Sequence, residues 1–477
     1  MLFNSAVFLL VFLPILLVVY YRLGHRQQNA FLVFASCVFY ASWDWRFLFA
    51  LLFTTSIDYA CARQMEASVA NGEPLALRRK YVVLSAVTNL GLLGFFKYFN
   101  FFADTLFELS ARIGLNVPLH TFEIILPIGI SFFTFQALSY TIDVYRGELH
   151  ATKSFWDFFL AVLYFPHLVA GPIQRAANLL PQVTHPRVVT REKVEDGVHL
   201  IIWGFFKKAF IADNLAPIVN ACFAAPDASF GNTVLGVFAF TFQIYCDFSG
   251  YTDIARGIAK IMGFEFVLNF NLPYFATNPS DFWRRWHISL SSWLRDYLYK
   301  SLGGNRVGAL RTQFNLMATM VLGGLWHGAA WNFVLWGSYH GAILVAHRLA
   351  TPGLQIIETT VFRHAARAWL VLRVACMFAL TFYGWLLFRA TSLHQVAAMT
   401  ASLTRIGDGV DWSQLGLVAA IIAPLVCVQI LQLTSGELMF QKLPLFPRPM
   451  RAVVYSLMLY CMLFLGGAPQ AFVYFQF

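Results

Sequence analysis

Charged residues are scarce in this 477-residue chain: Asp, Glu, Lys and Arg together make up 12% of it, against roughly 25% in soluble domains. Hydrophobic residues reach 58%, and phenylalanine alone contributes 49 residues. A soluble fold could not cover so much apolar surface, which excludes a cytosolic enzyme, a secreted domain and a DNA-binding protein. The net charge of +10 is attributed instead to loops that face the cytoplasm, where anionic lipid attracts Lys and Arg.

Cysteine is also sparse: the seven cysteines are scattered singly, and no CxxC or Cys/His cluster occurs. Neither a disulfide framework nor a structural zinc site is therefore indicated. The HExxH, GxSxG and P-loop signatures are missing, so their zinc, serine and phosphate chemistries are unsupported. The first apolar run lacks a basic flank and a small-x-small cleavage site, so we expect a retained first span.

No internal repeat divides the chain into two similar halves, the arrangement from which many secondary transporters are built. Carboxylates inside apolar runs are few, and the main candidates are Asp58, Asp143, Asp247 and Asp253. Both absences disfavour proton-coupled transport, although a transporter or export scaffold without acyl chemistry stays the alternative. Without a hinge or low-complexity tract, a single membrane domain over residues 1–477 is predicted.

Apolar runs between charged breaks predict an all-α polytopic membrane protein. The candidate spans are 5–20, 29–43, 46–62, 82–102, 124–141, 198–222, 233–262, 312–325, 327–347, 368–389, 413–433 and 452–467. The stretch 155–172 is apolar but contains Pro166 and Pro172, which favours a re-entrant segment shielded by other helices. With the N-terminus outside, most Lys and Arg residues fall on cytoplasmic segments, as membrane topology prefers. The external segments then keep only Arg46, Arg112, Arg389 and Arg405.

A histidine stands within a long apolar region, in the sequence GGLWHGAAWNF at 323–333. Small neighbours would let a ligand approach the His327 imidazole, and a titratable group at membrane depth is a functional hypothesis by default. A histidine bonded to a backbone carbonyl for helix packing is the alternative. On one continuous helix, His340 would lie about 220° around the axis from His327, so His340 is interpreted as structural.

A second histidine stands in the sequence DFWRRWHISLSSWLRDY at 281–297. At a helical pitch, Trp286, His287 and Trp293 share one face and the arginines lie opposite. This pattern predicts an amphipathic helix at the membrane surface, with tryptophans buried and arginines among lipid head groups. His287 is a second candidate because a passive polar residue is unexpected on the apolar face. A capping or interfacial role for it stays open.

A third stretch, QIYCDFSGYTD at 243–253, places several polar side chains within an apolar span. Groups at that depth need partners, so a hydrogen-bonded network beside a cavity is predicted. The polar interruptions at 127–136 and 166–172 are interpreted as broken segments that line the same interior. Within the second of them, His167 is expected to be a structural partner.

Together these motifs resemble the membrane-bound O-acyltransferase family, through WHG at 326–328 and FWRRWH at 282–287. The branch that the chain resembles most is the bacterial alginate O-acetyltransferases. That resemblance includes LPIGISFFTFQALSYTIDVYRG from 126, FPHLVAGPIQR from 165 and YCDFSGYTDIA from 245. It covers nearly the whole chain and is densest at 125–345.

The resemblance implies about 11–13 transmembrane or re-entrant helices around a central tunnel, in a bacterial inner membrane. His327 matches the family's catalytic histidine and His287 its second motif residue, so both are predicted to be catalytic. The implied reaction takes an acetyl group from a cytoplasmic thioester, either acetyl-CoA or an acylated carrier protein. The acetyl group then crosses the membrane for O-acetylation of a secreted polysaccharide, alginate, with another envelope polymer as the alternative. No tightly bound cofactor or metal is expected.

A hydroxyl that attacks a thioester needs a base to remove its proton, and a histidine of pKa ~6.5 suits that task near neutral pH. His327 is therefore predicted to be the general base. His287 would orient the acceptor or polarise the thioester carbonyl. Because no periplasmic polysaccharide-binding domain is recognisable, we also expect a separate periplasmic acetyltransferase and the polysaccharide export machinery as partners, and no nucleic acid.

Overall fold

The computed structural model describes residues 1, 3–115, 124–169, 171–225 and 228–473. Among these residues every regular element is a helix, as the all-α prediction requires. The chain forms two compact units: Met1–Gly197 with Ala255–Val267, and Val198–Ile254 with Leu268–Phe477. The assignment of residues 1–477 to a single membrane domain stays a prediction.

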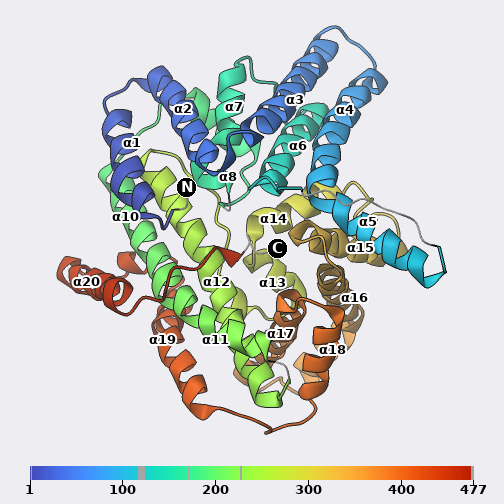
Figure 1. The fold of residues 1–477 in the computed structure, drawn as a ribbon, viewed down its shortest axis with the longest axis vertical. Helices are drawn as coiled ribbons and strands as arrows, with labels where there is room; N and C mark the ends of the chain where they lie inside the picture. The colour runs from blue at the N-terminus through green and yellow to red at the C-terminus, as the bar shows by residue number, and fades with distance from the viewer. Residues whose placement is uncertain (2, 116–123, 170, 226–227, 474–477) are drawn as a thin grey trace. The chain divides into compact units, whose positions relative to one another are not determined.

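The first unit contains short and long helices from the N-terminal part of the chain (Figure 1). In order they are η1 (Phe8–Phe12), α1 (Leu13–Tyr20), α2 (His25–Asp44), α3 (Phe47–Ala70), α4 (Leu75–Leu93), η2 (Gly94–Tyr98), α5 (Phe99–Arg112), α6 (Ile130–Arg146), α7 (Phe155–Leu163), α8 (Phe165–Leu168) and α9 (Ala176–Thr184). Two further helices, α10 (Arg191–Phe205) and α12 (Phe230–Ile261), contribute residues to both units.

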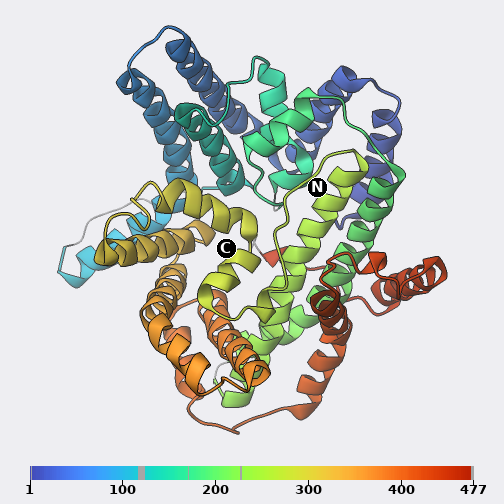
Figure 2. The same cartoon turned by 180° about the vertical axis from the view of Figure 1, so that it is seen from behind.

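Helices α3, α4 and α6 pack side by side (Figures 1 and 2) and enclose Asp58, one of the predicted intramembrane carboxylates. Its Oδ1 accepts hydrogen bonds from Ser85 Oγ at 2.6 Å and Asn89 Nδ2 at 2.9 Å. Ser85 Oγ also lies 2.9 Å from Thr141 Oγ1 on α6. A buried polar group must be satisfied internally, and here that requirement links three helices.

The predicted re-entrant stretch 155–172 is broken, as its prolines suggested. Helix α7 ends before Tyr164, and the four-residue α8 follows with Pro166 inside it. His167 is buried, and its Nε2 lies 3.1 Å from the Ala161 carbonyl oxygen, a structural contact. The neighbouring prediction of a span at 124–141 was wrong at its start, because Gly129 adopts a left-handed φ of 77° and α6 begins only at Ile130.

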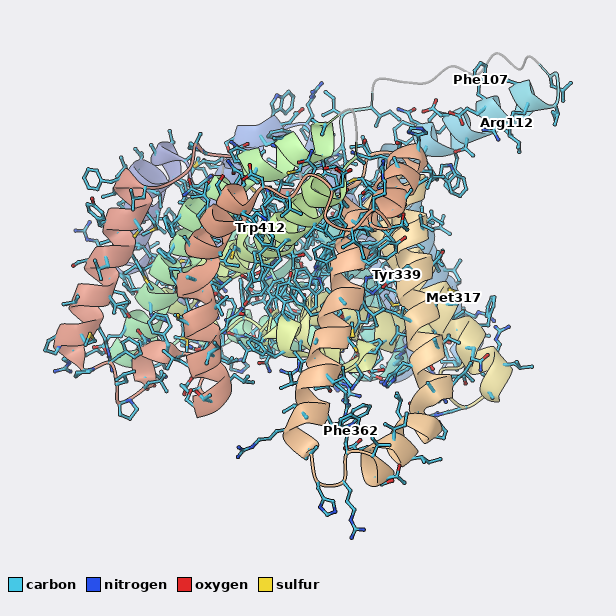
Figure 3. All side chains as sticks on the ribbon, turned by 90° about the horizontal axis from the view of Figure 1, so that it is seen from below. Phe107, Arg112, Met317, Tyr339, Phe362 and Trp412 are labelled. Atoms are coloured by element: carbon cyan, nitrogen blue, oxygen red, sulfur yellow. The ribbon has the colours of Figure 1, made fainter. Side chains whose placement is uncertain are left out.

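The second unit contains the remaining helices. They are η3 (Phe206–Ala212), α11 (Asp213–Ala224), η4 (Pro273–Phe275), α13 (Pro279–Arg285), α14 (Ile288–Trp293), η5 (Leu294–Tyr299), α15 (Ala309–His327), α16 (Trp331–Thr360), α17 (Ala366–Arg389), α18 (Leu393–Ser402), α19 (Trp412–Ser435), η6 (Phe440–Lys442) and α20 (Arg448–Phe464). Helix α16 packs on both α15 and α17. Figure 3 shows this group, with Met317 on α15, Tyr339 on α16 and Phe362 near the turn between α16 and α17.

Within the described part of the chain, three helical stretches are long and apolar enough to cross a membrane: Leu75–Arg112, Ala366–Arg389 and Trp412–Ser435. The first joins α4, η2 and α5, and the other two are α17 and α19. Their outward side chains include Val371 and Leu417, which are 67% and 49% exposed. Apolar surface of this kind suits contact with lipid.

Candidate active site

The end of α15 is placed by close contact with α16, which glycines permit. A Cβ atom added to Gly324 would lie 2.2 Å from the Phe333 carbonyl oxygen, and one added to Gly337 would lie 2.4 Å from the Met320 carbonyl oxygen. Only glycine, which has no Cβ atom, allows the two backbones to approach so closely. Helix α15 then ends at His327, and Gly328 continues in extended conformation. The small residues of the GGLWHGAAWNF motif therefore allow close helix packing, in addition to their predicted part in giving a ligand access to His327.

His327 lies in an aromatic box and is 5% exposed. Its ring centroid is 5.1 Å from the ring of Trp326, 5.1 Å from that of Trp336 and 5.4 Å from that of Phe388. His327 is nevertheless one of the residues that line a cavity of about 340 Å³. The structure thus provides space for a ligand beside this imidazole.

The cavity has an apolar wall and a polar, positively charged side. Helices α15 and α16 contribute apolar residues such as Met320 and Leu344, together with the backbone of Gly323. The segment from α13 to η5 contributes the exposed cations Arg284 and Arg295 as well as Ser280, Ser291 and Ser292. Arg295 is partly neutralised by Asp296, which accepts from its Nε and one terminal nitrogen at 3.0 Å each. This combination suits a ligand with an apolar part and an anionic part.

The predicted surface helix over 281–297 is broken, and two of its three tryptophans are buried. Helix α13 ends at Arg285, and His287 adopts a left-handed conformation with φ of 43° before α14 begins. Trp286 and Trp293 are 2% and 7% exposed, so they are buried within the protein. The continuous amphipathic helix was therefore a wrong prediction, although Arg284 and Arg295 are exposed as expected.

Asn269 contacts both the His287 side chain and the backbone that follows His287. The Asn269 side-chain Oδ1 lies 3.1 Å from His287 Nδ1 and accepts from the Ser289 backbone N–H at 3.2 Å. The Asn269 carbonyl also accepts from the backbone N–H of Ile288 at 2.9 Å. Since a backbone N–H can only donate, the atom facing both groups is the amide oxygen, and His287 Nδ1 must carry a proton. In neutral His287 the lone pair is therefore on Nε2.

The two predicted histidines come together, with ring centroids 6.5 Å apart. They differ in access, because His287 is 0% exposed and is not among the residues that line the cavity. Phe248 of α12 packs edge-on against His287 at 4.6 Å. The sequence reasoning missed Asn269 and did not relate Phe248, within the 243–253 stretch, to His287. The polar Asn269 between the apolar residues of VLNFNLP at 267–273 was an available signal.

His340 is not on the same helix as His327, so the angular argument for separating them was wrong. The chain leaves helical conformation at Gly328 and resumes as α16 at Trp331. His340 packs against Trp336 at 4.7 Å and Trp283 at 5.1 Å. It is 1% exposed and is not a cavity-lining residue.

The polar stretch at 243–253 forms an ion-pair network with two lysines of η3. Lys207 Nζ lies 2.7 Å from Asp253 Oδ2, and Lys208 Nζ lies 2.6 Å from Asp247 Oδ1. Lys208 also pairs with Asp213 at 2.8 Å. The predicted network therefore exists, but it is ionic as well as hydrogen-bonded. The sequence reasoning missed the lysines because they lie inside the predicted span 198–222, where two adjacent cations were the signal.

Comparison with known proteins identifies the family. The model of the MBOAT, or membrane-bound O-acyltransferase, family matches residues 148–388. A protein of Azotobacter vinelandii named "Probable alginate O-acetylase AlgI" is 42% identical over 94% of this chain and 87% of its own length. The peptidoglycan O-acetyltransferase of Helicobacter pylori is 35% identical, over 83% of this chain and 78% of its own. The teichoic acid D-alanyltransferase of Bacillus subtilis is 31% identical over 46% of this chain and 58% of its own.

The chain belongs to the membrane-bound O-acyltransferase family, and it is a membrane acyltransferase. The family match includes both histidines and the whole cavity wall from Ser280 to Leu344. In the described ranges, no group of three or more His, Cys, Asp or Glu side chains is arranged to hold a metal ion. The roles of His327 and His287 stay predictions.

Proposed function

We propose that this protein transfers an acetyl group from a cytoplasmic thioester, across the inner membrane, for O-acetylation of a secreted polysaccharide, alginate. The observation that carries the proposal is the position of His327, which lines a cavity and lies beside a second, hydrogen-bonded histidine. Alginate is favoured over other polymers because a relative named as an alginate O-acetylase matches 94% of the chain.

In the proposed reaction His327 is the general base. Its imidazole removes the proton of an acceptor hydroxyl as the oxygen attacks the thioester carbonyl carbon. The new C–O ester bond forms, the C–S bond breaks, and the proton is passed from His327 to the departing thiolate. The reaction therefore consumes one thioester and one alcohol and yields one ester and one thiol, without an added reactant.

His287 is proposed to orient the acceptor rather than to polarise the thioester carbonyl. Polarising a carbonyl requires a donated N–H, and the Nδ1 proton of His287 is directed at Asn269. The Nε2 lone pair of the neutral ring can only accept. A hydroxyl or the neighbouring imidazole is therefore the better partner for it.

The cavity supports a phosphate-bearing thioester as the donor. Acetyl-CoA and an acylated carrier protein both present the acyl group on a phosphopantetheine arm, and Arg284 at the cavity's charged side could bind its phosphate. Binding of each donor to the purified protein in nanodiscs distinguishes the two. Arg284→Gln should weaken binding of whichever donor is used, whereas Arg363→Gln, an exposed arginine outside the cavity, should not.

The reaction itself is tested by deleting the gene and measuring acetyl ester on the exported polymer. We expect the acetyl ester to be lost and the amount of secreted polymer to be retained. Normal acetylation with impaired secretion would instead point to an export scaffold.

The final acceptor is proposed to be reached through partners, namely a separate periplasmic acetyltransferase and the polysaccharide export machinery. An assay with purified protein, thioester donor and soluble alginate tests this division of labour. We expect acetylation of the polymer only when the periplasmic partner is added. Efficient acetylation by the purified protein alone would overturn the relay.

A further inference from the structure

A second cavity, of about 320 Å³, lies in the same unit as the active site but shares no lining residue with the first cavity. One wall is a face of α16 that includes Thr351, Gln355 and Glu358. The opposite wall is a face of α17 with positions at helical spacing, including Arg373 and Leu380. Figure 3 shows these two helices running to the turn near Phe362.

The cavity is amphipathic along its length. Gln355, Glu358 and Arg373 lie toward the turn between α16 and α17, whereas Met377 and Leu380 lie farther along α17. From Arg373 to Leu380 the helix advances about 10 Å. Leu372 and Leu380 are 44% and 37% exposed, so the apolar part opens at the side of a helix that is able to cross the membrane. An acyl chain could enter from that side.

Arg373 stands about 10 Å along α17 from its first residue, inside a candidate membrane span. An arginine at such a position is costly and is retained where it binds a partner. Its contacts are long: 3.4 Å to the Thr277 carbonyl oxygen, 3.3 Å to Thr277 Oγ1 and 3.8 Å to Glu358 Oε2. Charge-assisted hydrogen bonds of arginine usually measure 2.7–2.9 Å, and its fork of five N–H donors matches a phosphate.

The surrounding charge is positive. Arg363 and Arg367 are exposed in the α16–α17 turn and in the first turn of α17, and Glu358 is the only carboxylate among the residues that line the cavity. Basic pockets between membrane helices bind the head groups of anionic lipids. We propose that this second cavity is a binding site for an anionic phospholipid, with its phosphate on Arg373 and an acyl chain along Leu372 and Leu380.

The site has a direct connection to the active-site segment. Thr277, which contacts Arg373, precedes Asn278, and the Asn278 side chain caps α13 by accepting from the Asp281 N–H at 2.9 Å. Helix α13 ends two residues before His287. A bound lipid that draws Arg373 toward its phosphate would compete with the contacts to Thr277. The lipid site is nevertheless tested by binding alone and does not depend on the proposed reaction.

Two cysteines of the chain provide the test. Cys376 lines the second cavity and is exposed, while Cys427 is exposed on α19 and does not line the cavity. Detergent-purified protein is treated with N-ethylmaleimide in the presence of phosphatidylglycerol or phosphatidylcholine vesicles. Peptide mass spectrometry then gives the alkylation rate of each cysteine in the same molecules.

We expect phosphatidylglycerol to slow alkylation of Cys376 relative to Cys427 by about tenfold at tenfold excess over its dissociation constant, when nine-tenths of sites are filled. Phosphatidylcholine and inorganic phosphate should protect far less. Arg373→Gln should remove the protection, and Arg405→Gln, at an exposed arginine that does not line the cavity, should keep it. Arg373→Lys, which retains the charge without the fork, should be intermediate.

Equal protection by the two lipids, or protection that persists in Arg373→Gln, would overturn the head-group assignment. Protection by inorganic phosphate alone would indicate a free-anion site in place of a lipid site. Should Arg373→Gln fail to fold, the comparison of phosphatidylglycerol, phosphatidylcholine and phosphate on the unchanged protein still decides between these outcomes.

Discussion

His327 and His340 are two buried histidines that contact the same indole and yet differ in access. Their ring centroids lie 5.1 and 4.7 Å from that of Trp336, and they are 5% and 1% exposed. His327 stands at the end of α15 and lines a cavity. His340 lies within α16, packs against Trp283 and lies close to Gly384 of α17. Burial and aromatic neighbours are therefore similar for the two side chains. What differs between His327 and His340 is that only His327 lines the cavity.

The largest effect should come from His327→Ala. Loss of a general base costs about 10²–10⁴-fold in rate. Acetyl transfer by the protein in nanodiscs, assayed with thioester donor and the periplasmic partner, should therefore fall by that factor at equal protein concentration. Size-exclusion chromatography checks that the variant remains folded. A rate close to that of the unchanged protein would make His327 a packing residue and remove the contrast with His340.

A smaller effect should follow when the cavity beside His327 is narrowed. A Cβ atom added to Gly323 would lie 3.1 Å from Leu294 Cδ1, and the branched side chain of Gly323→Val would occupy cavity space. We expect kcat/KM for the thioester donor to fall about tenfold, mainly through KM, because a misfit of one or two methyl groups costs ~1–3 kcal/mol. Gly416→Val is the control, since no atom lies within 4 Å of a Cβ at that membrane-helix glycine.

Removing the Asn269 side chain, which holds His287, should lower acetyl transfer by less than Gly323→Val does. Asn269→Ala deletes the acceptor of the His287 Nδ1 proton, a hydrogen bond with a net value of about 0.5–1.5 kcal/mol. The transfer rate should therefore fall roughly three- to tenfold. Asn269→Asp keeps an acceptor oxygen in place and should recover most of the rate. If both variants behaved alike, the hydrogen bond to His287 would have no part in the reaction.

The smallest change in rate is expected for His340→Ala, within about threefold. Its effect should be on stability, because truncating a large buried side chain leaves a void that costs ~2–5 kcal/mol. Thermal unfolding followed by intrinsic fluorescence would measure this loss. A decrease in transfer rate as large as that of His327→Ala would show that the two histidines act together and that cavity access does not distinguish them.

Hydropathy alone predicted the positions of most long helices, because a long apolar segment must satisfy its backbone hydrogen bonds internally. Within the described residues, three of these stretches are long and apolar enough to cross a membrane. The spans near 413–433 and 368–389 correspond closely to α19 and α17. Breaks inside apolar stretches were harder to predict. The start of α6 depends on a left-handed Gly129 packed against Leu168, a contact between residues far apart in sequence.

The candidate site was predictable in its residue types but not in its geometry. The motifs marked His327 and His287, but the left-handed backbone at His287 arises from hydrogen bonds to Asn269, eighteen residues earlier. Helical periodicity cannot report such a contact. The same limit applies to Lys207 and Lys208, since their partners Asp253 and Asp247 come from a different helix.

The π-helical turn η5 has a consequence for how sequences of this family should be aligned. The Lys300 N–H donates to the carbonyl of Arg295, five residues earlier. In an α-helix the N–H donates to the carbonyl four residues earlier, so the η5 turn contains one additional residue. Deleting a single residue there would convert the π-helical turn into an ordinary α-helical turn and change the spacing of the side chains along it. Because Leu294, Arg295 and Tyr299 all line the active-site cavity, a one-residue gap in a relative at this point would mark a differently shaped cavity, whatever the level of identity elsewhere.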